Sequence, residues 1–336
     1  MIDVAVDART TRRMSVGVRK YLGELIARLP AAAPDLRCVP IGRGENFGVS
    51  EQLGLPLAIV RSGARLVHFP TTYAPLLRPR PYVVTIHDLI HLRYAALFGR
   101  SAALHYRFVG VPLARAARRL IVGDERTIAD CEALLGARPE RCRVVPLGYD
   151  PELLEAREPL VAEQPFLFYA GNHKPHKNLG TLFAAWAAIA PQRTIDLRIT
   201  GNADPGIAQR YWRQRGRLIF SGHLTPAELH RHYRAALAYV HPALSEGFGI
   251  PMLEAAVVGT PVIASAGAIP SIVRPYAWIF DPSDVGALTA LLDEVVRDPT
   301  PFAARAAEGA RPLQAYTWDR FAAGTAAVYR EVIECS

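Results

Sequence analysis

Two glutamates, Glu246 and Glu254, flank a glycine-rich turn and have seven residues between them. Gly247 and Gly249 would let the backbone approach a ligand closely, and the proline that follows them suits the first turn of a helix expected over 251–258. Backbone amides and the helix dipole at such a turn favour a phosphate. Carboxylates accept hydrogen bonds from hydroxyls, so Glu246 could bind a sugar ring and Glu254 a ribose diol. The segment predicts a sugar-nucleotide site; a capped helix with two solvated glutamates is the alternative.

Arginine outnumbers lysine by 36 to 3 in this chain, so the position of each lysine is informative. Lys174 and Lys177 follow an expected strand, and Asn178 is placed to cap the next helix. A compact ammonium there can neutralise the pyrophosphate charge that develops as a glycosyl bond breaks. A solvated basic loop is the alternative interpretation.

His87 and Asp88 directly follow a strand expected over 82–86. This order places His87 at the carboxyl end of the strand, where parallel sheets bind ligands. A buried structural histidine is the alternative. His91 would not share a helix face with His87 as metal ligands do, and the chain contains no Asp-x-Asp motif. We therefore expect no metal ion and no cofactor.

Short β-type runs alternate with helical patterns along the whole chain, which favours parallel sheets covered by helices. A capping box at Thr225–Glu228 predicts a helix over 226–236, and a last helix is expected over 318–332. The expected strands are 2–7, 66–69, 82–86, 119–122 and 142–146 in the first half, and 166–170, 237–241 and 260–264 in the second.

A chain of 336 residues is long for one core and suits two domains. A charged segment with three prolines, 150–166, marks the linker, so we expect domains over 1–158 and 159–316 and a final helix over 317–336. No Gly-x-Gly-x-x-Gly follows a strand, which makes a nicotinamide-dependent oxidoreductase the weaker interpretation. The chain has no signal-peptide pattern and no apolar run of about 20 residues, so we expect a cytoplasmic protein with four reduced cysteines.

The segment Leu89–Gly123 has no acidic residue but six arginines interspersed with aromatic residues. On an ideal helix Arg100, Arg107 and Arg118 would point within about 20° of one another, although a glycine and a proline would interrupt that helix. Such a face suits an anionic membrane, so we expect peripheral association with the inner face of the cytoplasmic membrane. A solvated arginine-rich helix is the alternative, and without a recognition motif we expect no nucleic-acid partner.

Taken in order, these motifs resemble the retaining GT-B glycosyltransferases of the large group that includes many bacterial mannosyltransferases. The Glu-x7-Glu element is the signature of that group, and the resemblance covers nearly the whole chain. The other segments that carry it are 2–9, 84–89, 144–150, 169–178 and 317–321.

The resemblance implies an α/β fold of two Rossmann-like domains with parallel sheets facing a central cleft. The N-terminal domain would bind the acceptor, the C-terminal domain the nucleotide sugar, and the last helix would cross back to the N-terminal domain. Catalytic roles are implied for His87, Lys177 and Glu246. Donor-binding positions are Gly17, Gly171, Asn172, His176, Gly247, Phe248, Gly249, Ile250 and Glu254; acceptor-binding positions are Arg19, Lys20, Tyr21 and Asp88.

Four positions depart from the pattern of the group. Arg19 stands in place of a second glycine, and Ser271 where glutamate is preferred. Asn172 and His176 stand where the group often has arginine. These departures favour, as one alternative, a degenerate protein that binds a sugar nucleotide without catalysis.

The function that the resemblance implies is metal-independent, retaining transfer of a hexose to a lipid-linked or glycan acceptor in cell-surface polysaccharide assembly. The expected donor is GDP-mannose, and the expected transferred sugar is mannose. A glucosyl-, rhamnosyl- or N-acetylglucosaminyltransferase that uses a UDP- or dTDP-sugar is the other alternative.

Overall fold

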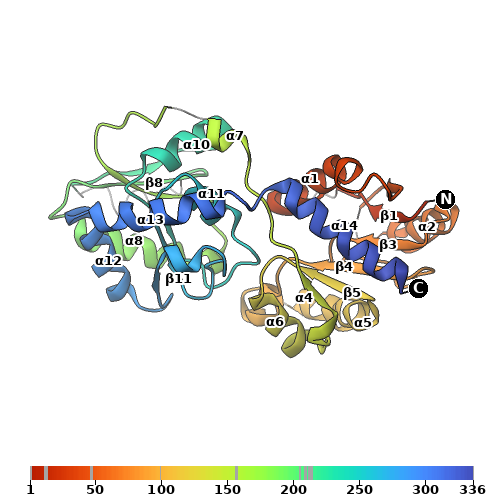
Figure 1. Ribbon diagram of the computed structural model, residues 1–336. Helices are drawn as coiled ribbons and strands as arrows, with labels where there is room; N and C mark the ends of the chain where they lie inside the picture. The colour runs from red at the N-terminus through yellow and green to blue at the C-terminus, as the bar shows by residue number, and fades with distance from the viewer. Residues whose placement is uncertain are drawn as a thin grey trace. The chain divides into compact units, whose positions relative to one another are not determined.

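The computed structural model describes residues 2–10, 14–45, 48–98, 100–155, 158–203, 206–207, 210 and 215–335. It divides into two compact units (Figure 1). The first contains Met1–Gly148 and Tyr316–Ser336, and the second contains Tyr149–Ala315. Each unit holds a six-stranded sheet, so the predicted two-domain α/β architecture is confirmed.

The sheet of the first unit has the strand order β2-β1-β3-β4-β5-β6, and all its pairs are parallel. β3, β4 and β5 have the predicted bounds. The strands are β1 (Val4–Asp7), β2 (Cys38–Ile41), β3 (Leu66–Phe69), β4 (Tyr82–Ile86), β5 (Arg119–Val122) and β6 (Cys142–Val144). The helices of this unit are α1 (Val16–Ala32), α2 (Leu55–Ser62), α3 (Ile90–Arg93), α4 (Arg100–His105), α5 (Val111–Ala116), α6 (Arg126–Leu135) and α14 (Trp318–Glu334).

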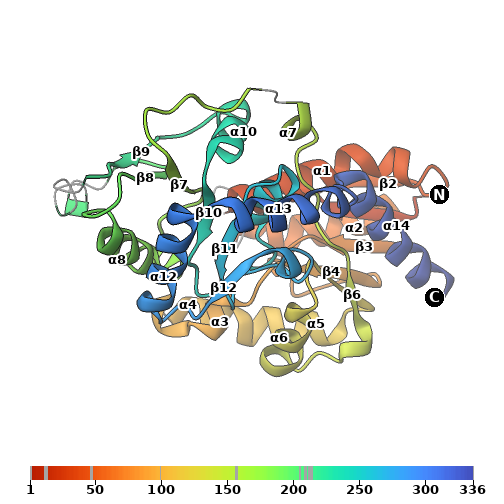
Figure 2. The same cartoon turned by 60° about the vertical axis from the view of Figure 1, so that its left-hand side comes forward.

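The sheet of the second unit is also parallel, with the order β12-β11-β10-β7-β8-β9 (Figure 2). Its strands are β7 (Phe166–Tyr169), β8 (Asp196–Ile199), β9 (Leu218–Phe220), β10 (Ala238–His241), β11 (Val262–Ser265) and β12 (Trp278–Phe280). Its helices include α7 (Glu152–Glu155), α8 (Leu179–Ile189), α10 (Pro226–Ala235), α11 (Ile250–Val257), α12 (Val285–Arg297) and α13 (Thr300–Leu313). The predicted capping box begins α10, where Thr225 and Glu228 exchange side-chain-to-backbone hydrogen bonds.

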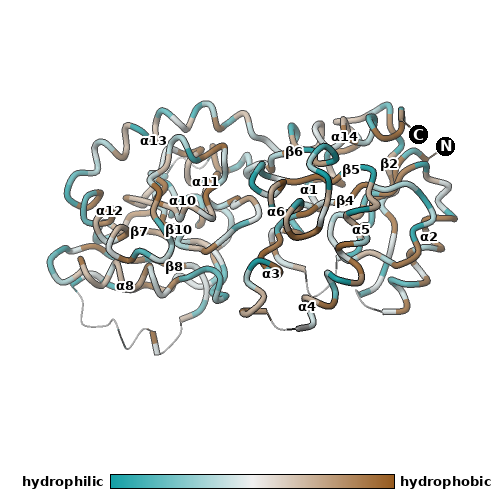
Figure 3. Tube along the Cα trace, turned by 90° about the horizontal axis from the view of Figure 1, so that it is seen from below, coloured by the Kyte–Doolittle hydropathy of each residue, from teal (hydrophilic) through white to brown (hydrophobic). Residues whose placement is uncertain are grey.

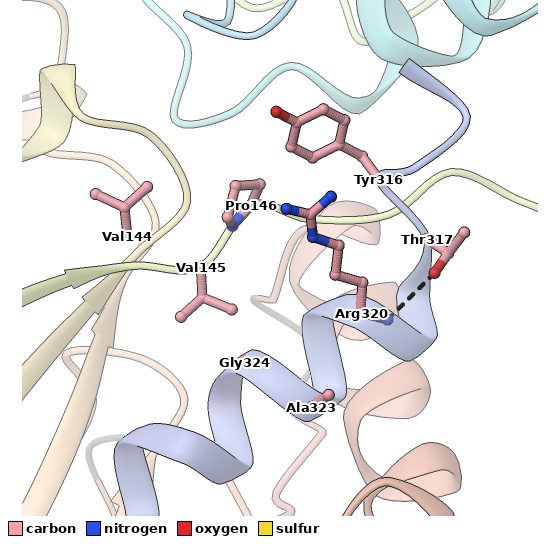
Figure 4. A pocket seen from close by; sticks show the side chains of 8 residues that line it. All are labelled: Val144, Val145, Pro146, Tyr316, Thr317, Arg320, Ala323 and Gly324. Carbon is pink, nitrogen blue, oxygen red and sulfur yellow. Dashed lines mark hydrogen bonds between the residues drawn. The ribbon is translucent and has the colours of Figure 1, made fainter. Parts of the chain in front are cut away.

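The C-terminal helix α14 packs on the first unit, against α1, β3 and β5. Its first residues are held by Thr317, whose hydroxyl accepts a hydrogen bond from the backbone N–H of Arg320 at 3.2 Å (Figure 4). Further along the helix, Tyr329 Oη lies 2.6 Å from Nδ1 of the buried His68 on β3. Burial lowers the pKa of His68 to about 3, so this ring is neutral and joins α14 to the sheet through hydrogen bonds alone.

The division between the units lies ten residues before the predicted boundary at residue 158. The described residues that follow the division, 149–155 and 158–160, are bonded to α10 of the second unit. Arg234 Nη2 donates to the carbonyl of Leu153 at 2.8 Å, and the backbone N–H of Leu160 donates to the carbonyl of Arg231 at 3.1 Å. The proline-bearing segment is therefore attached to the second unit and is not a free linker.

The predicted interruption of the arginine-rich α-helix takes the form of a π-helical turn and not of a break in the helix. Between α4 and α5 the chain forms a π-helical turn, Tyr106–Gly110, and Gly110 keeps right-handed helical angles. The backbone N–H of Val111 donates to the carbonyl of Tyr106 five residues earlier. Pro112 lies in the first turn of α5, where the wider turn accommodates a residue without an N–H donor.

Gly148 provides a test of how α14 is held. A Cβ atom on Gly148 would lie 2.2 Å from the backbone nitrogen of Trp318, so we expect Gly148→Ala to push the start of α14 away and to lower the free energy of unfolding by about 1–3 kcal/mol. Gly23, exposed within α1 and without an atom within 4 Å of its added Cβ, is the matched control. Gly23→Ala should raise the stability by up to about 1 kcal/mol in urea unfolding. A stable Gly148→Ala protein would contradict this packing.

Candidate active site

The glycine-rich turn connects β10 to α11 and holds Glu246. Gly249 directly precedes α11 and has a φ of +87°, a left-handed conformation that favours glycine. A Cβ atom on Gly249 would also lie 2.3 Å from Cε of Met252. α11 begins at Ile250, one residue before the predicted start, with Pro251 in its first turn. Backbone conformation and side-chain packing thus both fix this turn.

Glu246 meets two donors at one carboxylate oxygen. Lys177 Nζ donates a hydrogen bond to Glu246 Oε1 and forms an ion pair with it. His241 Nε2 lies 2.7 Å from the same oxygen. The side chains are 11% exposed for Lys177, 14% for Glu246 and 1% for His241. The structure therefore brings the predicted pair together and adds a histidine that was not predicted.

The charges in this cluster follow from burial and proximity. Burial alone would raise the pKa of the Glu246 carboxyl, but Lys177 and His241 hold that pKa well below its usual range. Burial lowers the pKa of His241, and the nearby Lys177 ammonium lowers it further, although Glu246 opposes both. Because Lys177 already supplies a full positive charge, we assign an ionised Glu246 and a neutral His241 at pH 7.

Asn178 ties the lysine turn to two neighbouring loops. Its Nδ2 atom donates to the carbonyls of Pro242 at 3.2 Å and Pro282 at 2.9 Å. Asn178 is the N-cap residue of α8, as predicted, but it has a φ of +53° and its side chain makes no capping hydrogen bond to α8, because its amide reaches across to these loops. The backbone N–H of Leu244 also donates to the carbonyl of His176 at 2.8 Å. These bonds fix the distance between the lysine turn and the glutamate turn.

The residues predicted to bind the donor in the lysine turn differ in burial. Gly171, Asn172 and Lys174 are exposed, and Asn172 Oδ1 accepts a hydrogen bond from the backbone N–H of Lys174 at 3.2 Å. His176 and Lys177 are only 7% and 8% exposed. Of the two lysines, Lys177 is thus the one that is held in a fixed position.

The remaining residues of the glutamate turn are mostly covered. Gly247 and Phe248 are buried, and Ile250 is partly exposed. Glu254 is 4% exposed and accepts a hydrogen bond from Tyr233 Oη at 3.2 Å. A ribose would have to reach this covered carboxylate, so the binding role of Glu254 stays a prediction.

In the first unit, His87 follows β4 as predicted. Its Nε2 atom lies 2.9 Å from the carbonyl of Pro70, and its ring packs edge-on against Tyr21 with centroids 4.6 Å apart. Burial lowers the pKa of His87, although Asp88 and the Pro70 carbonyl oppose this shift, so the ring is neutral at pH 7. Since a carbonyl only accepts, Nε2 carries the proton and Nδ1 is an acceptor suited to a substrate hydroxyl. Asp88 accepts a hydrogen bond from the backbone N–H of Ile90 at 3.1 Å and so holds the start of α3.

The predicted glycine loop after β1 differs from the structure, because Gly17 and Arg19 lie within the first turn of α1. Ser15 is the N-cap, and its hydroxyl accepts a hydrogen bond from the backbone N–H of Val18 at 3.3 Å. Both Gly17 and Arg19 are exposed. The arginine at the position of the second glycine is thus accommodated because this position is helical.

Lys20 and Tyr21 both contact other residues of the first unit. The Lys20 ammonium lies 5.9 Å from the centre of the Trp318 ring on α14. Tyr21 is 1% exposed, and its hydroxyl lies 2.7 Å from Thr85 Oγ1. Tyr21 supports His87 through its ring, and its acceptor-binding role stays a prediction.

A buried charge network at the end of β1 was also not predicted. Arg9 Nη2 lies 2.7 Å from Asp7 Oδ2, and Arg9 Nη1 lies 3.0 Å from Glu51 Oε2. Arg9 also donates to the carbonyl of Tyr73 at 2.8 Å. An arginine two residues after a strand-ending aspartate was the local signal, but its glutamate partner is distant in sequence.

The fold and these sites define a two-domain α/β glycosyltransferase of the GT-B type. Residues 152–312 match the family described as "Glycosyl transferases group 1", and residues 27–153 match "Glycosyltransferase Family 4". An MMP alpha-(1->4)-mannosyltransferase from Mycolicibacterium hassiacum is 30% identical over 336 residues, which cover 93% of this chain and 79% of the relative. This chain belongs to the family 4 type of group 1 glycosyltransferases.

Other relatives and solved structures agree with this assignment. A D-inositol 3-phosphate glycosyltransferase from Acidothermus cellulolyticus is 27% identical, over 75% of this chain and 62% of the relative. The structure of a sucrose-phosphate synthase from Thermosynechococcus elongatus matches with a TM-score of 0.73 at 20% sequence identity. The structure of HepE from Anabaena, solved with UDP-glucose, matches with a TM-score of 0.70 at 16% sequence identity. Both structural matches cover 100% of this chain and 100% of the other, and at these identities they show the fold alone.

The burial difference between the two lysines gives a test of the site. We expect Lys177→Ala to lower the turnover number by roughly 100-fold or more, because it removes the charge that the resemblance assigns to the leaving phosphate. The exposed Lys174 is the matched control, and Lys174→Ala should change turnover by less than about threefold. The measurement is the steady-state release of nucleoside diphosphate at saturating donor. A larger loss in Lys174→Ala would show that the other lysine serves the phosphate.

Proposed function

We propose that this chain is a retaining, metal-independent glycosyltransferase that transfers mannose from GDP-mannose to a lipid-linked or glycan acceptor. The observation that carries the proposal is the buried contact of Lys177, Glu246 and His241 at the carboxyl edge of the second sheet. It combines a cation for a phosphate with a carboxylate for sugar hydroxyls. Two relatives support mannose: the M. hassiacum protein and, at 26% identity over 47% of its length, the O-antigen chain mannosyltransferase B of Escherichia coli.

In the proposed reaction the bond between the sugar C1 atom and the β-phosphate oxygen breaks. The acceptor oxygen bonds to C1 on the same face, and its proton passes to the leaving phosphate oxygen. The products are a nucleoside diphosphate and a glycoside of retained configuration. Lys177 stabilises the charge on the leaving phosphate, Glu246 orients the sugar hydroxyls, and Nδ1 of His87 accepts a hydrogen bond from a hydroxyl.

A donor screen in the presence of excess chelator tests this function. We expect GDP-mannose at 100 times its dissociation constant to stabilise the protein by about 2.7 kcal/mol in thermal unfolding, and GDP to be released slowly without acceptor. Among the described residues, no group of three or more His, Cys, Asp or Glu side chains is placed to hold a metal ion. Activity should therefore survive chelation.

Each alternative gives a different result in that screen. Stabilisation by a UDP- or dTDP-sugar in place of GDP-mannose would identify the rival donors. Stabilisation without release of a nucleoside diphosphate would identify the non-catalytic binding protein. Activity that is lost in chelator and restored by magnesium would contradict the metal-independent mechanism.

We also propose that the first unit docks on an anionic membrane surface. Of the arginines expected to share a helix face, Arg107 and Arg118 are exposed, but Arg118 lies beyond the end of α5 at Ala116. The side chain of Arg100 lies outside the described residues, and the π-helical turn changes the helical phase on which the expected alignment depended. No helix in the described part of the chain is long and apolar enough to cross a membrane.

An apolar stripe of exposed side chains along residues 49–60, the segment that leads into and forms α2, supports this docking. The hydropathy of this segment is coloured along the trace at α2 in Figure 3. The stripe consists of Val49, Leu53, Leu57 and Val60, which are 74%, 69%, 48% and 52% exposed. The opposite side of the same segment is buried through Leu55 and Ile59. From residue 46 to residue 87 the chain has one acidic residue, Glu51, and it is buried against Arg9. An exposed apolar stripe in a basic surrounding fits an anionic bilayer.

Vesicle co-sedimentation tests the docking. We expect Leu53→Gln combined with Leu57→Gln to weaken binding to anionic vesicles by about tenfold or more, because two apolar side chains no longer insert. Arg107→Gln combined with Arg118→Gln should weaken binding at low salt, since each arginine contributes on the order of 1 kcal/mol and is screened over about 8 Å. Val161→Gln, at a 90% exposed position of the second unit, is the control. A wild-type protein that never sediments, even at low salt, would make a soluble acceptor the better proposal.

A further inference from the structure

His241 is the last residue of β10 and is held in one orientation by its neighbours. Its ring stacks on Tyr169, with centroids 5.7 Å apart and planes at 26°, and on Tyr239, at 5.9 Å and 24°. Tyr239 Oη lies 2.9 Å from His241 Nδ1 and 3.0 Å from the carbonyl of Ala170. Two tyrosine rings and a tyrosine hydroxyl therefore fix both the plane and the rotation of the imidazole.

This orientation determines which nitrogen carries the proton. The carboxylate of Glu246 only accepts hydrogen bonds, so His241 Nε2, at 2.7 Å from Oε1, must be the donor. In the neutral ring Nδ1 then carries no proton, and it accepts from the Tyr239 hydroxyl, whose single proton also faces the carbonyl of Ala170. The Glu246 carboxylate thus selects the tautomer.

The mechanism makes competing demands on Lys177, the other donor to Glu246. Before the reaction its ammonium is bonded to Glu246 Oε1. As the glycosyl bond breaks, negative charge grows on the leaving phosphate and attracts the same ammonium. Glu246 is 14% exposed, and without a second donor it would lose its orientation at the moment when it must hold the sugar.

We propose that His241 is a positioning residue that holds Glu246 in place while Lys177 moves to the leaving phosphate. The proposal rests on the proposed glycosyl transfer. It differs from a packing role because it requires a donor at the ε position of the side chain and not only a filled volume. It also requires that Lys177 and His241 act on the same carboxylate oxygen, as they do here.

Side-chain chemistry at position 241 provides the test. Gln can place its amide nitrogen where Nε2 of the histidine lies, whereas Leu fills similar space without a donor. We expect His241→Leu to lower the turnover number by about 10- to 100-fold with less than a threefold change in donor KM, as for a misplaced catalytic group. His241→Gln should restore at least a third of the wild-type turnover number.

His232 offers a matched control in the same unit. It is 6% exposed, packs on Phe168 and bonds to the carbonyl of Glu228 within α10. His232→Leu should lower the melting temperature as a buried histidine variant does, while the turnover number stays within threefold of wild type. Equal turnover in His241→Leu and wild type, equal loss in the Leu and Gln variants, or an equal loss in His232→Leu would each overturn the proposal.

A second measurement keeps this proposal separate from the proposed function. Long-range proton–nitrogen NMR spectra of protein labelled at histidine should show His241 as the neutral ring protonated at Nε2, and Glu246→Gln should change its nitrogen shifts. If the wild type turns over no sugar nucleotide, the proposed function fails. The spectra would still show whether His241 donates a hydrogen bond to Glu246. A ring protonated at Nδ1, or nitrogen shifts that do not change in Glu246→Gln, would overturn the proposed role of His241.

Discussion

A carboxylate from which water is largely excluded stays ionised only if cations or donors replace the lost solvation. Glu246 has this replacement because Lys177 and His241 meet at its Oε1 atom. The two donors come from different segments, the turn after β7 and the end of β10. β7 and β10 are adjacent and parallel, so both segments reach the same edge of the sheet. The ionised state of Glu246 thus depends on the strand order of the second unit.

The first unit also brings buried charged residues together, but there they pair with one another. Its sheet also gathers polar residues at the carboxyl edge, where β1, β3 and β4 are neighbours. There Arg9 closes on Asp7 and Glu51 in a buried network, and His87 is fixed by the carbonyl of Pro70. Removing one partner of such a network would leave a buried charge without compensation. Through the carbonyl of Tyr73, Arg9 also holds the loop after β3, which contains Pro70.

Local patterns predicted part of each sheet, and tertiary contacts decided much of the rest. β3, β4 and β5 are apolar runs and were predicted to the residue, whereas β8 was missed because it carries Asp196 and Arg198 among its four residues. Asp196 is buried there only through its ion pair with Arg217, which lies 21 residues away. Lys177 and Glu246 each stand in a short motif, so the spacing of nearby residues predicted them. The burial of Tyr21 depends on a distant residue and was not predicted. Its partner Thr85 is 64 residues away, and no local pattern encodes such a contact.

The choice of lysine at position 177 is physically informative in a chain with 36 arginines and 3 lysines. The Arg9–Asp7 pair shows what the guanidinium does with a buried carboxylate. Arg9 Nε lies 2.9 Å from Oδ1, and Arg9 Nη2 lies 2.7 Å from Oδ2, so both oxygens of Asp7 are bound. A lysine has one compact ammonium on a flexible stem and binds Glu246 at Oε1 only. Such a contact leaves the second oxygen for a ligand and lets the charge move, whereas a forked arginine would make the pair structural.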